Sequence, residues 1–306
     1  MKRFGIVLVC VLLAGCSQPE RVVTNSSTAP ARDKSVSELS KKKDPLAKFF
    51  KPMTEVVGDW LTHHPEDGET FEEYIESRPT LPTADRNTIY ILPIGNFSPA
   101  QMKIIRLTAE YMRAFYDLPV VLKDRKPLGN VPKEMVRVQY PNNRQIRTSY
   151  FVDDLLPAIL PKDAAALICL TSNDLYPGET WNFVFGQASL EKRVGVWSLW
   201  RLEKEGGKPV DKNLFLDRTL KVAMHETGHM FSMRHCTKYE CLMSGTNHLA
   251  ETDRRPLDTC PECTMKIAWG MNYPLADRYK NLAEFWRKQN RPDEQKRMLE
   301  KANAIR

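Results

Sequence analysis

Two histidines one helical turn apart, with a third six residues further on, restrict most strongly how this chain can fold. The motif reads His225-Glu226-Thr227-Gly228-His229 and is followed by His235. Residues i and i+4 lie on the same face of a helix, so His225 and His229 can reach one ion. The chain must then leave the helix and turn back to bring His235 to that ion. The sequence therefore predicts a helix, a sharp reversal and a three-histidine metal site.

The chemistry expected of this motif is metal-assisted hydrolysis. Three neutral imidazoles leave zinc with its full charge and one open position, which lowers the pKa of a bound water toward neutrality. Glu226 follows the first histidine, where its carboxylate can face that water instead of the metal. We therefore expect a catalytic zinc held by His225, His229 and His235, with Glu226 as the catalytic general base. The alternative is a polar helix face whose histidines bind only protein groups.

Four cysteines close to this motif form a second pattern. They fall into two close pairs, Cys236 with Cys241 and Cys260 with Cys263. This spacing is typical of a closed, tetrahedral structural zinc, so two Zn²⁺ ions are expected in all. Two disulfides are the alternative, because an exported protein meets an oxidising compartment. A further cysteine, Cys169, lies in an apolar run and is expected to be a buried thiol.

The N-terminus indicates export. Two positive charges at Lys2 and Arg3 precede an apolar run that ends shortly before Cys16. The run is too short for a membrane span, which needs about 20 residues. Small residues before Cys16 resemble the bacterial lipobox, so we expect a lipoprotein signal peptide over residues 1–15 and a lipid on Cys16. An ordinary secretory signal with a chance cysteine is the alternative.

The segment after Cys16 predicts a tether. Residues 16–43 are rich in Ser, Thr, Pro and basic side chains and carry few apolar ones. Such a segment cannot bury enough apolar surface to offset its ordering entropy. Ser17 in place of Asp is similar to outer-membrane lipoproteins of Gram-negative bacteria. The expected location is therefore a bacterial cell envelope, lipid-anchored, facing the periplasm if the cell is Gram-negative.

The remaining chain alternates between strand and helix patterns. We expect an N-terminal helical extension at 44–87, a catalytic domain at 88–270 and a C-terminal helical extension at 271–306. Apolar and β-branched runs predict strands at 88–92, 120–122, 164–170, 181–185 and 194–202. Capping signals and apolar periodicity predict helices at 99–115, 144–160 and 217–232. This alternation indicates a mixed α/β layer structure.

Charge excludes one class of partner. The formal net charge of +7 is mild for 306 residues. It is not gathered with aromatic residues into a nucleic-acid-binding motif, so no nucleic acid is expected. We expect a monomer that meets its peptide partner and touches the membrane only through its N-terminal lipid.

The metal motifs together resemble those of the archaemetzincin family of metzincin-clan zinc metallopeptidases. The family pattern, HExxHxxGxxHC followed by a Cys-x-Met and a CxxC, is matched by His225 to Cys236, Cys241-Leu242-Met243 and Cys260 to Cys263. The resemblance implies a metzincin-like mixed, twisted α/β sheet, an active-site helix carrying HExxH, and peripheral helices. It also implies that Met243 forms a turn beneath the catalytic zinc. Residues 174–188 would supply an edge strand for extended substrate.

Two departures from the family pattern matter. Ser232 stands where the family has a glycine, and a positive φ there would cost about 1 kcal/mol. Archaemetzincins also mostly look cytosolic, whereas this N-terminus indicates export. A peptide-binding envelope protein that keeps zinc without turnover is the alternative to a peptidase, and the intact Glu226 favours the peptidase. The sequence leaves open the substrate, aminopeptidase or endopeptidase action, and the residue that stabilises the oxyanion, with Tyr239, His248 and Arg254 nearby in the chain.

Overall fold

The computed structural model describes residues 36–139, 143–189 and 191–306. The expected signal peptide, Cys16 and most of the expected tether therefore lie outside the described residues. Within the ranges given, no helix combines the length and the apolar character that crossing a bilayer requires.

A mixed five-stranded sheet forms the centre of the molecule. Four strands run parallel, namely β1 (Thr88–Ile94), β2 (Val120–Leu122), β5 (Ala164–Thr171) and β8 (Val194–Ser198), and β7 (Gly186–Ser189) pairs antiparallel with β8. The order across the sheet is β2-β1-β5-β8-β7, so β7 is an edge strand. The strands predicted at 88–92, 120–122 and 164–170 are confirmed, and β8 begins as predicted but ends four residues early.

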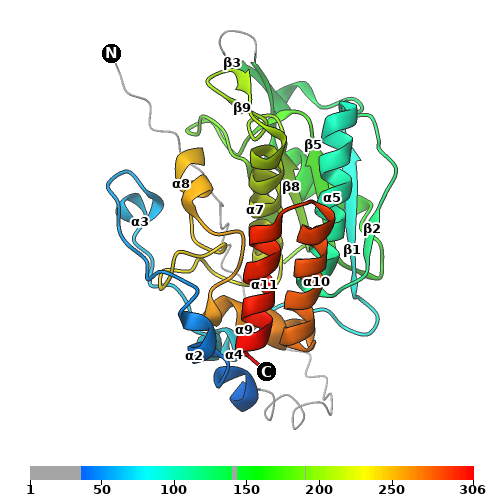
Figure 1. Cartoon of the computed structure of the whole chain (residues 1–306). Coiled ribbons are helices and arrows are strands. Elements are labelled where there is room, and N and C mark those ends of the chain that lie inside the picture. Colours follow the sequence, from blue (N-terminus) through cyan, green and yellow to red (C-terminus); the bar gives the residue numbers. More distant parts are fainter. Residues whose placement is uncertain (1–35, 140–142, 190) are drawn as a thin grey trace.

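Both faces of this sheet are covered. Alternate residues of β5 belong to different apolar clusters, with Ile168 in the larger cluster and Cys169 in the smaller one. The larger cluster includes residues of α5 (Pro99–Tyr116) and α7 (Lys212–Met230), which stand in front of the sheet in Figure 1. The smaller cluster includes residues of the π-helix η2 (Tyr150–Leu155) and α6 (Leu156–Ala158). Successive residues of a strand face opposite layers, and both layers are buried. The sequences of these strands are therefore nearly continuous apolar runs.

The two long helices begin at side-chain caps. Ser98 accepts the N–H of Gln101, and the Gln101 side chain accepts the N–H of Ser98, so the predicted start of α5 is confirmed. Helix α7 starts at Lys212 instead of the predicted Asp217. The reason is Asp211, whose carboxylate accepts the N–H groups of Asn213 and Leu214.

The helix predicted at 144–160 is wrong in its first four residues and confirmed from residue 148 to residue 158, where η2 and α6 lie. Residues Asn143–Arg147 form β4, which pairs with β3 (Val136–Gln139) on one side and β6 (Asp174–Tyr176) on the other. Pairing with two strands satisfies the backbone there, so tertiary contacts override the local helical pattern. The strand predicted at 181–185 is also wrong, because in that stretch only Val184 forms a bridge, to Leu175.

Shorter elements complete the described chain: α2 (Lys43–Ala47), α3 (Trp60–His63), α4 (Phe71–Glu76), η1 (Lys133–Met135), β9 (Lys204–Glu205), β10 (Lys208–Pro209), α8 (Leu249–Arg254) and α9 (Pro261–Met271). The predicted C-terminal helices are confirmed as α10 (Leu275–Lys288) and α11 (Pro292–Ala304), side by side in Figure 1. They do not pack only on the outside, because Tyr279, Phe285 and Trp286 are buried in the larger cluster.

Candidate active site

The three histidines of the motif meet at the C-terminal end of α7. His225 and His229 lie on one face, with their Nε2 atoms 3.0 Å apart. The chain then reverses at Ser232, whose φ of 63° is left-handed, and returns His235 to the same place. One ligand nitrogen from each ring lies within 4.8 Å of the others. The structure thus brings together the three histidines that the spacing predicted to share one ion.

Hydrogen bonds fix which nitrogen of each ring faces the common point. The Nδ1 atom of His225 lies 2.9 Å from the carbonyl oxygen of Leu242, and that of His229 lies 2.7 Å from the carbonyl oxygen of Met233. The Nδ1 atom of His235 lies 2.9 Å from a carboxylate oxygen of Glu66. Because these oxygens only accept, Nδ1 carries the proton and Nε2 keeps its lone pair in each ring.

The unprotonated nitrogens fit a metal ion. His235 Nε2 is buried and has no hydrogen-bond partner among the described residues. Burial lowers the pKa of His225 to about 3 and that of His229 well below its ordinary value, so both rings are neutral at pH 7. Tetrahedral zinc with bonds of about 2.0–2.1 Å separates its nitrogens by about 3.4 Å. The observed cluster needs only small adjustments to hold such an ion.

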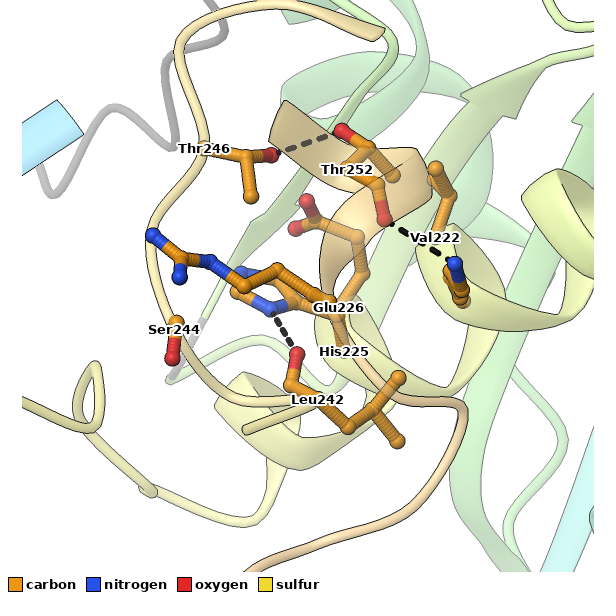
Figure 2. Close-up of a pocket in the computed structure, with 9 residues that line it drawn as sticks. Val222, His225, Glu226, Leu242, Ser244, Thr246 and Thr252 are labelled. Atoms are coloured by element: carbon orange, nitrogen blue, oxygen red, sulfur yellow. Dashed lines mark hydrogen bonds between the residues drawn. The ribbon is translucent and has the colours of Figure 1, made fainter. Parts of the chain in front are cut away.

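Glu226 lies beside this cluster and lines a cavity with His225. Figure 2 shows the pocket and the hydrogen bond between His225 and Leu242. The cavity of about 20 Å³ holds about one water molecule. Its lining comes from α7, the turn after it, and α8 with the residue that follows: Lys221, Val222, His225, Glu226, Leu242, Ser244, Thr246, Thr252 and Arg255.

The edge strand passes close to the same carboxylate. A Cβ added to Gly186, the first residue of β7, would lie 3.6 Å from Glu226 Cγ. Of the segment expected to supply an edge strand, 174–188, the structure therefore places the β7 part next to the candidate general base. Because β7 pairs within the sheet only with β8, its other edge would suit pairing with an extended chain.

Met243 packs under the histidine helix. It is fully buried, and a Cβ added to Gly228 would lie 2.6 Å from the Met243 sulfur. Gly228 stands between Glu226 and His229, so the methionine supports the helix at the metal-binding turn. The Met243 carbonyl also accepts the N–H of Cys236 at 2.8 Å, which links this turn to the cysteine cluster.

The four cysteine sulfurs converge at a second point. All lie within 4.8 Å of one another, and the sulfurs of Cys236 and Cys260 are 3.5 Å apart. A disulfide bond would be about 2.05 Å, and the cysteines are free thiols, whereas tetrahedral zinc with bonds of about 2.3 Å spaces sulfurs by about 3.8 Å. The N–H groups of Met243 and Cys260 donate to Cys241 Sγ. The arrangement fits one zinc better than two disulfides.

Two residues of the site were missed by the sequence analysis. Glu66 contacts His235 from 169 residues away, and Trp60 packs edge-on against the same ring with centroids 5.2 Å apart. Both belong to the segment 44–87, in which no motif was found. Neither residue type has a spacing relation to His225, so no pattern in the chain could have identified them.

The residues considered for the oxyanion do not reach the pocket. Tyr239, His248 and Arg254 are absent from its lining in the described part of the chain. Arg254 pairs with Asp59 at 2.5 Å, and His248 caps α8 by accepting the N–H of Glu251. Arg255, one residue further on, does line the pocket, and its buried Nε has no hydrogen-bond partner in the residues described.

Three imidazoles on and after an HExxH helix, an adjacent glutamate and a mixed α/β fold define the class of zinc metallopeptidases. The model of peptidase family M54 matches residues 123–269. Mouse archaemetzincin-2 is 32% identical over 273 residues, covering 79% of this chain and 76% of the mouse protein. The chain therefore belongs to the archaemetzincin family, and it is a zinc metallopeptidase whose substrate is a peptide or protein.

Archaeal relatives match a smaller share of the chain than the mouse protein does. The archaemetzincin of Thermococcus kodakarensis is 33% identical over 181 residues, covering 58% of this chain and 94% of the archaeal protein. The crystal structure of archaemetzincin from Methanopyrus kandleri aligns with a TM-score of 0.50 and 27% identity, covering 63% of this chain and 99% of that one. Each archaeal protein is matched over nearly its whole length by about 60% of this chain, so the present chain extends well beyond the shared part.

Proposed function

We propose that this chain is a peptidase of the bacterial cell envelope, tethered through a lipid on Cys16, with Glu226 as its general base. We also propose two zinc ions, a catalytic one on His225, His229 and His235 and a structural one on the four cysteines. The observation that carries the proposal is the convergence of the three histidines, one of which, His225, lines a pocket together with Glu226.

Zinc, Glu226, the groups that orient the histidines and strand β7 have separate roles in the proposed hydrolysis. Zinc, when bound, supplies a positive charge that polarises the peptide carbonyl and acidifies water. Glu226 accepts a proton from the attacking water and returns it to the leaving amine nitrogen. Leu242, Met233 and Glu66 hold the three imidazoles in the tautomer that offers Nε2. Strand β7, at the sheet edge beside Glu226, is the proposed docking edge for extended substrate.

Removal of the Glu226 carboxylate tests turnover. Glu226→Gln should lower the rate of peptide cleavage by about 10²–10⁴-fold, because a positioned general base contributes about that much. Zinc content should stay at the wild-type value, since Glu226 is not a ligand, and atomic emission on both proteins checks this. Equal and negligible cleavage by wild type and variant would support the alternative, a zinc-binding envelope protein without turnover.

A peptide library in which half the members are N-acetylated would separate the two modes of cleavage. Cleavage confined to free amino termini means an aminopeptidase, and equal cleavage of both halves means an endopeptidase. Labelling with radioactive palmitate in a bacterial host tests the tether. Label on the wild type and none on Cys16→Ser is the expected result, and an unlabelled wild type would remove the lipid anchor from the proposal.

A further inference from the structure

The residues that precede the catalytic domain wrap around the loop that carries His235. We call residues 51–71 the belt and residues 234–241 the zinc loop. The two run antiparallel, with the N–H of Met53 donating to the carbonyl of Lys238 at 3.1 Å. The N–H of Glu240 donates back to the carbonyl of Lys51 at 2.9 Å. The Thr237 hydroxyl donates to the carbonyl of Asp67. The belt therefore follows the zinc loop over most of its length.

Two glycines show how closely the belt is fitted. A Cβ on Gly245 would overlap the indole of Trp60, and a Cβ on Gly68 would overlap the Thr237 hydroxyl. Gly68 also has a φ of +74°, which favours glycine independently. The N–H of Trp60 donates to the buried carboxylate of Glu251 at 3.1 Å. Trp60 is thus fixed both by close packing of its ring and by a hydrogen bond from its backbone N–H.

The belt places one carboxylate on the third zinc ligand. Glu66 accepts from His235 Nδ1 at 2.9 Å and from Trp60 Nε1 at 2.9 Å. The other two imidazoles are oriented by backbone carbonyls. Among the three ligands, His235 is therefore the one whose orientation depends on a side chain. It also lies on a loop after the helix, whereas His225 lies within α7.

We propose that Glu66 is a positioning residue for the catalytic zinc. It holds His235 with Nε2 toward the common point, and Trp60 holds Glu66. This inference rests on the proposed zinc at the three histidines. The belt lies outside residues 123–269, which the family model matches. The belt, which the sequence predicted to be only an N-terminal extension, thus contributes a residue to the metal site.

Zinc affinity of the full-length lipoprotein in detergent tests this role. Chelator competition, with native mass spectrometry to count ions, should show that Glu66→Ala binds the histidine-site zinc about 10–100-fold more weakly. The zinc affinity of Glu66→Gln should lie between those of the wild type and Glu66→Ala. The glutamine oxygen can still accept one hydrogen bond, whereas its amide nitrogen faces His235 Nδ1–H and cannot accept. Trp60→Phe keeps an aromatic ring but loses the N–H that donates to Glu66. Its loss of zinc affinity should therefore be smaller than that of Glu66→Ala. Cobalt substituted at the histidine site should show a shifted visible spectrum in Glu66→Ala.

The matched control is Glu55→Gln, a carboxylate on the same belt that is exposed. It should bind both ions like the wild type. The zinc on the four cysteines reports folding, and it should stay bound in every variant. Unchanged histidine-site affinity and cobalt spectrum in Glu66→Ala would overturn the proposal. So would equal loss of both ions from all Glu66 and Trp60 variants, which would mean that the belt only supports the fold.

The outcomes also separate this inference from the proposed function. A wild type that binds zinc at the histidines, shows the Glu66 effect and cleaves no peptide would refute turnover and uphold the positioning role. A wild type that holds no zinc at the histidines would overturn both.

Discussion

Ser232 shows how one residue can carry a conformation that glycine would adopt more easily. Its φ of 63° lies in the left-handed region, as the family pattern led us to expect for this position. The conformation costs a non-glycine residue about 1 kcal/mol. The Ser232 hydroxyl accepts the N–H of Thr80 at 2.9 Å, a contact that a glycine could not make. A hydrogen bond of this kind is worth about 1 kcal/mol, so the two effects nearly cancel.

Substitutions at Ser232 should separate these two terms. Ser232→Gly should change the free energy of unfolding by less than about 1 kcal/mol, since relief of strain offsets the lost hydrogen bond. Ser232→Ala keeps the strain and loses the hydrogen bond, so it should be less stable than the wild type by about 1 kcal/mol. Urea unfolding of the three proteins measures both values. An alanine variant as stable as the glycine variant would show that the conformation costs nothing here.

At the scale of elements, the cysteine cluster joins two segments that lie on either side of α8 in the sequence. Cys236 and Cys241 flank the turn after the active-site helix, whereas Cys260 and Cys263 stand at the N-terminus of α9. The two residues that follow Cys241 are Leu242, which orients His225, and Met243, which packs under Gly228. A zinc at the cysteines would therefore stabilise the loop on which the catalytic site rests.

Loss of one thiolate should disturb this loop. Cys263→Ser should reduce the ion count of the chain from Ser17 onward from two to one, and should lower its melting temperature. Native mass spectrometry counts the ions in wild type and variant. A wild type carrying one zinc and a mass lower by four hydrogens would instead mean two disulfides. Cys169→Ser serves as a control for the ion count, because Cys169 lies apart in strand β5.

At the scale of the whole molecule, a buried carboxylate ties the C-terminal helices to the catalytic part. Asp258, just before α9, pairs with Arg278 of α10 at 3.0 Å and Lys301 of α11 at 2.8 Å. Burial alone would raise the pKa of Asp258, but Lys301 and Arg278 outweigh it and hold the pKa below its ordinary value. The helices α10 and α11 are therefore fixed by charge as well as by apolar packing.

Asp258→Asn should destabilise the protein by about 3–5 kcal/mol, because it leaves two buried cations without their partner. The sign of the pH dependence follows from the lowered pKa. The stabilisation from Asp258 is fully present above the unfolded pKa of 3.8 and is lost as pH falls through the lower folded pKa. The difference between wild type and variant should stay constant from neutral pH to about pH 4.5 and shrink below that. Urea unfolding across this range checks the prediction.

The sequence by itself determined the local parts of this protein. The helical repeat makes i and i+4 neighbours, so the spacing of His225 and His229 was enough to predict a shared metal. Buried parallel strands read as apolar runs, which allowed β1, β2 and β5 to be found. The cysteine pairs predicted a second metal in the same way, because each pair is close in the chain.

Only the tertiary structure decided what depends on distant partners. Residues 143–147 became a strand because β3 and β6 lie on either side of them. Residues 181–185 stayed irregular although four of their five side chains are apolar. Glu66 reaches His235 because the belt pairs with the zinc loop. The two residues are 169 positions apart, so no periodic pattern in the sequence indicates their contact. Spacing specifies what one helix or one turn can bring together, and packing of separate segments specifies the rest.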